Sequence, residues 1–263
     1  MKKYKLVILL ILLINNPLQV KAQNTISYSA NLGGLRVAEL TYSVNLKKEK
    51  WNIKTEILAA GIVDTFVSFV FSSESKGILI NNQIQPELYT FSYEIKNKNK
   101  SRSARIKYRD GIPVELESDP KYKDSDTLST DELKKYGTNS RDPNSAFVVS
   151  GTLKNPCLEN SKSFDGVRSY EIKMSKKNKK TKLIIDEIEY GAVICMGSFN
   201  PIIGYEESDF LETTSERNSI RYWYSYFEKD KVWIPIKFIV NTPLGALVVK
   251  ANKIISNGER NEN

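Results

Sequence analysis

The sequence has no histidine, and it contains only two cysteines and three methionines. Histidine is the usual general base for serine and cysteine nucleophiles and the commonest metal ligand in proteins. Two cysteines without histidine also fall short of the usual four-ligand zinc set. We therefore expect no catalytic residues, no metal site and no cofactor.

Two short stretches match catalytic or metal-binding motifs only in part. Ser73 and Lys76 have the S-x-x-K spacing of serine acyl-enzymes, but the accompanying K-T-G and S-D-N motifs are absent. The acidic run 124–132 has carboxylates at calcium-loop offsets. Ser129 and Lys135, however, stand where an EF-hand needs glycine and glutamate. Neither stretch predicts a site.

Long hydrophobic runs are missing after the N-terminus. A lysine-rich start is followed by the apolar run 6–14 and the small-x-small end Val20-Lys21-Ala22. This order is typical of a cleaved signal peptide, and the run is too short for a transmembrane helix, which needs about 20 residues. We expect residues 1–22 to be removed, leaving a periplasmic protein that begins at Gln23 and has no transmembrane helix.

Loss of the signal peptide lowers the charge. Four lysines leave, so 39 − 4 = 35 basic residues face 31 acidic ones, a net charge of +4 in place of +8. We expect no nucleic-acid partner. The basic turns within 94–107 and 175–182 are solvated hairpin tips or contacts with anionic lipid head groups or acidic polymer.

If the protein is exported, its two cysteines are expected to be oxidised. In an oxidising compartment, an even and minimal count predicts one disulfide, Cys157–Cys195, with two buried free thiols as the alternative. The intervening residues have the pattern of a hairpin followed by a third strand. The bridge would therefore fasten the edge of a meander, and we expect neither cysteine to be catalytic.

Strand signals recur along the whole chain at spacings of about ten residues. Alternating runs flank Gly33-Gly34, and others close the chain at "SIRYWYSYF", "KVWIPIKFIV" and "LGALVVKANKI". Pro235 lacks a ladder donor, so its strand is expected at an edge or with a bulge. We predict one all-β domain over residues 23–258, a partly open barrel or β-spiral with one or two short helices, and a disordered tail at 259–263.

Two segments interrupt the strand pattern. Residues 61–72 have a polar stripe at helical spacing, and four apolar residues lie opposite it: Ile62, Phe66, Phe69 and Val70. We expect either a core helix that closes one end of the sheet or a mobile lid over a ligand groove. The polar stretch 119–151 could link two domains, but we expect a long surface connection within one sheet. Asp142-Pro143 in it predicts a short helix over 143–150.

Several of these stretches resemble one family. "YSANLGGLRVAELTYSV", "DPNSAFVV", "CLENSKSFDGVRSYEI" with "CMGSFNPIIGY", and "KVWIPIKFIVNTPLGALVV" are similar to segments of domain of unknown function 3108, a family of bacterial exported proteins. The resemblance implies a curved antiparallel sheet with no assigned reaction, similar to open barrels of periplasmic lipoprotein carriers and to spiral envelope-integrity proteins. The family often has more than one arginine after Asp-Gly, whereas Arg168 stands alone here as a candidate anionic contact.

Together these observations favour a non-enzymatic protein that supports cell-envelope integrity. It would be a binding module for a lipid acyl chain or a lipoprotein segment, or a scaffold for other envelope proteins, with peripheral membrane contact. A hollow barrel interior favours the first role and a packed interior the second. A hydrolase of an envelope polymer is the alternative.

Overall fold

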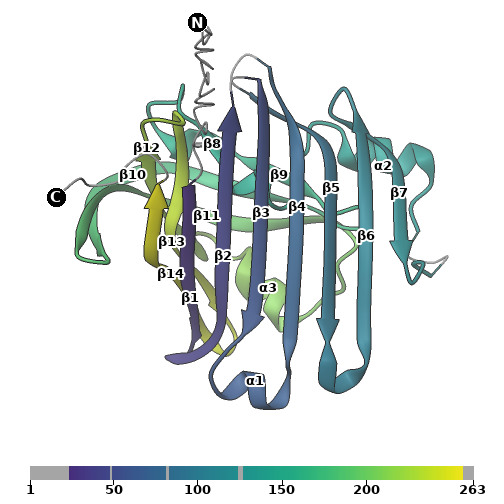
Figure 1. The fold of residues 1–263 in the computed structure, drawn as a ribbon, viewed down its shortest axis with the longest axis horizontal. Coiled ribbons are helices and arrows are strands. Elements are labelled where there is room, and N and C mark those ends of the chain that lie inside the picture. The colour runs from purple at the N-terminus through teal and green to yellow at the C-terminus, as the bar shows by residue number, and fades with distance from the viewer. Residues whose placement is uncertain (1–23, 48, 81–82, 124–126, 257–263) are drawn as a thin grey trace, which may run out of the picture.

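The computed structural model describes residues 24–47, 49–80, 83–123 and 127–256. They form one curved antiparallel sheet with the strand order β7-β6-β5-β4-β3-β2-β1-β14-β13-β12-β11-β10-β9, and β8 pairs with β13 (Figure 1). The strands are β1 (Asn24–Leu32), β2 (Leu35–Lys47), β3 (Lys50–Ala59), β4 (Phe69–Ile80), β5 (Gln83–Ile95), β6 (Lys100–Arg109), β7 (Ile112–Asp119), β8 (Val149–Ser150), β9 (Ser161–Phe164), β10 (Ser169–Ile185), β11 (Ile188–Ile203), β12 (Ile220–Phe227), β13 (Val232–Thr242) and β14 (Gly245–Ser256).

Helices are few and short. They are α1 (Ile62–Phe66), α2 (Thr130–Gly137), α3 (Asp209–Ser215) and the 3-10 turns η1 (Lys96–Lys98), η3 (Ser145–Phe147) and η4 (Pro156–Leu158). α2 begins where a capping box predicts a helix: Ser129 Oγ accepts from the Glu132 amide, and the Glu132 carboxylate accepts from the Ser129 amide. No helix in the described ranges is long and apolar enough to cross a membrane.

The first and last strands lie side by side in the middle of the sheet. β1 pairs with β2 on one side and with β14 on the other, so that Asn24 stands opposite Ser256. Both halves of the chain therefore belong to one sheet, and the prediction of an all-β, partly open barrel is confirmed. Pro235 is accommodated by a bulge, one of the two outcomes expected for it, because the register of β12 and β13 shifts between Trp223 and Tyr224.

β7 and β9 are the two edge strands of the sheet and do not pair with each other in the described structure. α2 packs against both edge strands, and Figure 1 shows it beside β7. We call the boundary between the two edge strands the seam. Gly137, at the end of α2, approaches so closely that an added Cβ would lie 2.2 Å from Pro113 Cγ on β7 and 3.0 Å from Phe164 Cδ1 on β9. Side-chain packing around α2 therefore joins the two edge strands, which share no backbone hydrogen bonds in the part of the chain that the structure describes.

Two expectations about the interrupting segments are wrong. The helix expected over 61–72 is only α1, and Phe69 and Val70 already belong to β4. β-Branched and aromatic residues dominate this segment, and they favour strand over helix. The helix expected over 143–150 is likewise a single 3-10 turn, η3, followed by β8.

The connection between β7 and β9 does not stay on the surface. Its central part enters the barrel, where Asp142 and Ser145 are fully buried and Asn144 is 4% exposed. Val148 beside them belongs to the main apolar cluster, together with Ile26, Ile53 and residues of β13 and β14. The segment 142–148 therefore fills one part of the interior as a plug.

Cys157 and Cys195 form a disulfide, the pairing expected from the sequence, with a Cα–Cα distance of 5.2 Å. It joins η4 to β11, and both half-cystines are fully buried in a second apolar cluster with Ile172, Tyr222 and Tyr224. The bridge therefore ties the end of the plug connection to the C-terminal half of the sheet.

Candidate functional site

The plug is held by a buried polar network. Ser75 Oγ donates to Asp142 Oδ1, which also accepts the amides of Asn144 and Ser145 at 2.9 and 3.0 Å. Ser73 Oγ and Thr55 Oγ1 donate to Asn144 Oδ1 at 2.8 and 2.9 Å. Burial raises the pKa of Asp142, against the effect of these donors. The network fastens the plug to the inner faces of β3 and β4.

The same network identifies the concave face of β4. Ser73 and Ser75 point to the plug, and successive side chains alternate across a strand. Phe69 and Phe71 therefore also face the interior, whereas Val70 and Lys76 face outward. Ser73 and Lys76 lie on opposite faces, so the S-x-x-K spacing does not bring them together.

The turn between β9 and β10 places Arg168. Asp165 Oδ1 accepts the amides of Val167 and Arg168 at 3.1 and 2.7 Å, and Asp165 Oδ2 accepts Arg168 Nε at 3.1 Å. Gly166 has φ 99°, and an added Cβ would lie 2.9 Å from Leu116 Cδ1. Only glycine combines this conformation with so close an approach to β7. The Phe-Asp-Gly-x-Arg motif thus builds a turn that crosses the seam.

Beside this turn lies a cavity of about 420 Å³. Its walls are the inner faces of β10–β13, the segment 205–211 and Phe147 of the plug. Most lining residues are aromatic or aliphatic, including Tyr170, Ile172, Met174, Phe199, Tyr205, Phe210, Leu211, Tyr222, Tyr224, Phe238 and Val240. The volume lies within the range of small-molecule sites, about 300–1,000 Å³.

Aromatic contacts give the cavity wall its shape. The ring centroids of Tyr170 and Phe199 are 5.0 Å apart, and Tyr205 meets Phe199 edge-on at 5.3 Å. Tyr222 and Phe238 form a similar contact at 6.0 Å. Burial raises the pKa of Tyr170, Tyr205 and Tyr222, so these phenols stay neutral at physiological pH.

Arg168 and Glu206 are the charged residues that line the cavity. An added Cβ on Gly204 would lie 2.7 Å from Arg168 Cγ, so this glycine lets the 203–205 backbone pack on the arginine. The Arg168 side chain keeps 55% of its surface exposed. Desolvation opposes its charge, but Asp165 and Tyr205 outweigh that effect and raise the pKa of Arg168.

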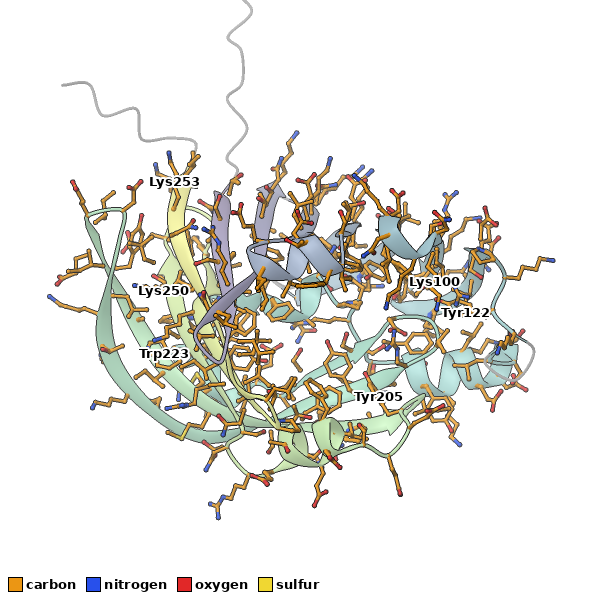
Figure 2. The ribbon with its side chains drawn as sticks, turned by 90° about the horizontal axis from the view of Figure 1, so that it is seen from below. Lys100, Tyr122, Tyr205, Trp223, Lys250 and Lys253 are labelled. Carbon is orange, nitrogen blue, oxygen red and sulfur yellow. A yellow bond between two sulfur atoms is a disulfide. The ribbon has the colours of Figure 1, made fainter. Side chains whose placement is uncertain are left out.

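A second arginine lies at the same seam. The Arg102 guanidinium carbon is 4.2 Å from the centroid of the Tyr122 ring, and Arg102 Nε is buried without a hydrogen-bond partner among the described residues. Burial raises the pKa of Tyr122, while Arg102 and Arg168 both oppose that rise. Both cations therefore act on one phenol. Figure 2 shows Tyr122 and Tyr205 on the same side of the interior.

The predicted groove residues do not line this cavity. Ile62 and Phe66 on α1 are 60% and 68% exposed, and α1 packs beside β2 at one end of the barrel. Of the predicted residues, Arg168 is the one that borders the cavity. The segment that does cover it, 205–214 with α3, escaped prediction; its sequence signals were the aromatic residues Phe199, Tyr205 and Phe210.

The cavity lining does not form a recognisable catalytic set. Ser161 Oγ donates to the Ala146 carbonyl at 3.0 Å, and Ser208 caps α3 by accepting the Leu211 amide at 3.2 Å. Within the described ranges, no group of three or more acidic or cysteine side chains could hold a metal ion. The calcium-loop offsets at 124 and 126 lie outside the described residues. The cavity combines a mostly apolar lining with two residues of opposite charge, Arg168 and Glu206.

Comparison with known proteins agrees with the sequence resemblance. The model of the family described as "Protein of unknown function (DUF3108)" matches residues 25–252. The crystal structure of a β-barrel-like protein of domain of unknown function DUF1849 from Brucella abortus is similar at 12% identity and a TM-score of 0.47, over 90% of this chain and 98% of that one. No curated protein matches the sequence. Because the family model covers nearly all of the sheet, the chain belongs to the DUF3108 family.

Proposed function

We propose that this protein is a non-catalytic binding module of the cell envelope that holds an acyl chain, free or on a lipoprotein segment, in the cavity beside Arg168. The observation that carries the proposal is the combination of an apolar cavity of about 420 Å³ with an arginine at its border. Burial of an acyl chain contributes about 0.8 kcal/mol per methylene. Arg168, whose Nε–H is held by Asp165, would use the rest of its guanidinium group to pair with an acidic head group by charge-assisted hydrogen bonds.

The distribution of packing supports a binding role over a pure scaffold. The plug and the main apolar cluster fill one part of the barrel with side chains. The region between β10–β13 and α3 keeps an internal space. The interior is therefore packed in one part and hollow in another, and the hollow part has the chemistry of an amphiphile site.

Export to the periplasm is part of the proposal. A disulfide between buried cysteines is compatible with an oxidising compartment. The signal peptide proposed for residues 1–22 lies outside the described residues. Mass spectrometry of the protein isolated from cells tests this point, because cleavage predicts an N-terminus at Gln23.

Organic extraction of the protein purified from its native envelope, followed by mass spectrometry, tests for a bound ligand. We expect lipid to co-purify with the wild-type protein. Leu211→Trp, which places a large ring at the cavity border, should lower the recovered lipid about tenfold. Leu58→Trp on the outer face of β3 is the matched control and should change nothing. Equal recovery from wild type and both variants, or no lipid in any, would refute the proposal.

The role of Arg168 is tested by comparing two probes of equal chain length. Arg168→Gln should weaken binding of a fluorescent fatty acid about tenfold, because the charged partner is lost. The methyl ester of the same fatty acid, which carries no charge, should bind the wild-type protein and the variant equally well. A variant that weakens both probes equally would show that Arg168 acts on packing and does not recognise the head group.

A further inference from the structure

The hairpin connections of the central sheet divide into two sets. Because neighbouring strands are antiparallel, the links β13–β14, β1–β2, β3–β4 and β5–β6 lie at one end of the barrel. The links β2–β3, β4–β5 and β6–β7 lie at the other end. Figure 1 shows the first set at the lower end, where α1 lies. The two ends can therefore be compared as surfaces.

Large apolar side chains are exposed along the first end. Leu35 after the β1–β2 turn is 62% exposed, and Leu244 in the β13–β14 turn is 78% exposed. Ile62 and Phe66 of α1, in the β3–β4 link, are 60% and 68% exposed. Single exposed apolar residues are normal, but contiguous ones mark an interaction surface.

These turns are in direct contact with one another. The Gly33 amide donates to the Ala246 carbonyl at 3.2 Å, which joins the β1–β2 and β13–β14 turns. An added Cβ on Gly61 would lie 2.5 Å from the Arg36 carbonyl oxygen, so the α1 link packs on β2. Asn97 Nδ2 donates to the Phe66 carbonyl, which joins η1 to α1. The four turns thus form one continuous ridge, which we call the apolar ridge.

Basic side chains stand at the end of the ridge. Lys96, Lys98 and Lys100 are exposed in and just after the β5–β6 link, and Figure 2, seen from the ridge end, shows Lys100. Asp64 is the acidic residue within the four links. Arg36 is already paired with Glu39 at 2.8 Å. Lys96 and Lys98 of the link and Lys100 at the start of β6 therefore stand with two exposed carboxylates, Asp64 and Glu94, on the same surface as the exposed apolar residues.

The opposite end has a different composition. Its three links in this part of the sheet, residues 48–49, 81–82 and 110–111, contain no large apolar residue, but Ile80 beside one of them is 44% exposed. Polar turns of this kind are the ordinary outcome for solvated hairpins. Leu35, Ile62, Phe66 and Leu244 are each more exposed than Ile80 and stand on neighbouring links, so hairpin formation alone does not explain them.

We propose that the apolar ridge docks the protein onto an anionic lipid bilayer. Aromatic and aliphatic side chains would enter the interface between head groups and acyl chains, and Lys96, Lys98 and Lys100 would contact anionic head groups. The combination of protruding apolar side chains and cations suits an anionic lipid surface. Apolar side chains alone would suit a protein partner, and cations alone would suit a soluble anionic polymer. This inference does not depend on a ligand in the cavity.

Sedimentation with lipid vesicles tests the proposal. Wild-type protein should bind vesicles that contain phosphatidylglycerol at least tenfold better than pure phosphatidylcholine vesicles, and salt should weaken the binding. The double variant Ile62→Ser/Phe66→Ser should lose at least tenfold in affinity. Ile80→Ser at the opposite end, where Ile80 is 44% exposed, is the matched control and should bind as wild type.

A second variant separates the two parts of the ridge. Replacing Lys96, Lys98 and Lys100 by glutamine should remove the preference for phosphatidylglycerol while leaving weak binding to both vesicles. Equal vesicle binding by wild type and the double variant overturns the proposal. So does a concentration-dependent dimer that the double variant abolishes in size-exclusion chromatography without vesicles, because the ridge would then be covered by a second copy of the chain.

Discussion

At the scale of single residues, Asp142 shows how one buried carboxylate holds two distant parts of the chain together. It is fully buried and accepts hydrogen bonds from Ser75 on β4 and from Ser145 within the plug. Asn144 beside it accepts from Thr55 and Ser73. A cavity can stay open beside such a plug only if the plug itself is fixed.

Asp142→Ala should therefore be strongly destabilising. It leaves Ser75, Ser145 and two backbone amides without their acceptor, and unsatisfied buried groups cost about 1–3 kcal/mol each before relaxation. We expect a loss of about 3 kcal/mol in urea unfolding. Asp142→Asn keeps one acceptor oxygen and should lose clearly less. Equal losses for the two variants would contradict this account, because the acceptor oxygen that asparagine keeps would then contribute nothing to holding the plug.

Gly166 is a second position where one residue decides a local structure. Gly166→Ala forces a side chain into φ 99° and towards Leu116 and Ile106, whose nearest atoms would be 2.9 and 3.0 Å away. Strain of this kind costs about 1–3 kcal/mol, which chemical denaturation can measure. Gly191→Ala is the control, since an added Cβ there meets nothing within 4 Å. A Gly166→Ala protein as stable as Gly191→Ala would contradict the close packing of the turn across the seam.

At the scale of elements, the disulfide is the covalent link between the plug connection and the sheet. Cys157 and Cys195 are 38 residues apart in sequence. Opening such a loop should cost about 4 kcal/mol on the chain-entropy model. Cys157→Ser/Cys195→Ser should therefore unfold at clearly lower urea concentration than the oxidised protein. Wild-type protein under reductant should match the double variant. If reduction leaves the midpoint unchanged, the loop is already constrained without the bridge.

How far the sequence predicts these elements depends on where their information lies. Alternation and turn residues are local, so most strands and the Gly33-Gly34 turn follow from the sequence, and Pro235 restricts its strand to an edge or a bulge. The basic stretch 175–182, expected as a hairpin tip, is an exception, because it lies within β10. The α1 segment misleads because its apolar spacing fits a helix while its β-branched and aromatic residues favour the strand β4. The plug around Asp142 looks like a surface loop because its partners, Thr55, Ser73 and Ser75, lie far away in the sequence.

The cavity was the hardest feature to predict. Its lining comes from five strands, the plug and α3, and no single stretch contains it. Arg168 is identifiable because a compact motif, Phe-Asp-Gly-x-Arg, surrounds it. Tyr170, Phe199 and Tyr205 look like ordinary core aromatics in the sequence, and only the fold shows that their rings border a space.

At the scale of the whole molecule, one sheet runs from β7 to β9 through the paired strands β1 and β14, so no natural cut divides it. The plug strengthens this unity, because it hydrogen-bonds to β3 and β4 and is followed directly by β8, which pairs with β13. Unfolding should therefore be a single cooperative transition.

The three tryptophans report on different parts of the sheet: Trp51 lies in β3, Trp223 in β12 and Trp233 in β13. Proteins that keep only Trp51 or only Trp233, with the others changed to phenylalanine, should each show a fluorescence midpoint that coincides with that protein's own far-ultraviolet circular dichroism. Separate fluorescence and circular dichroism midpoints within one protein would mean that the two halves fold independently despite sharing a sheet.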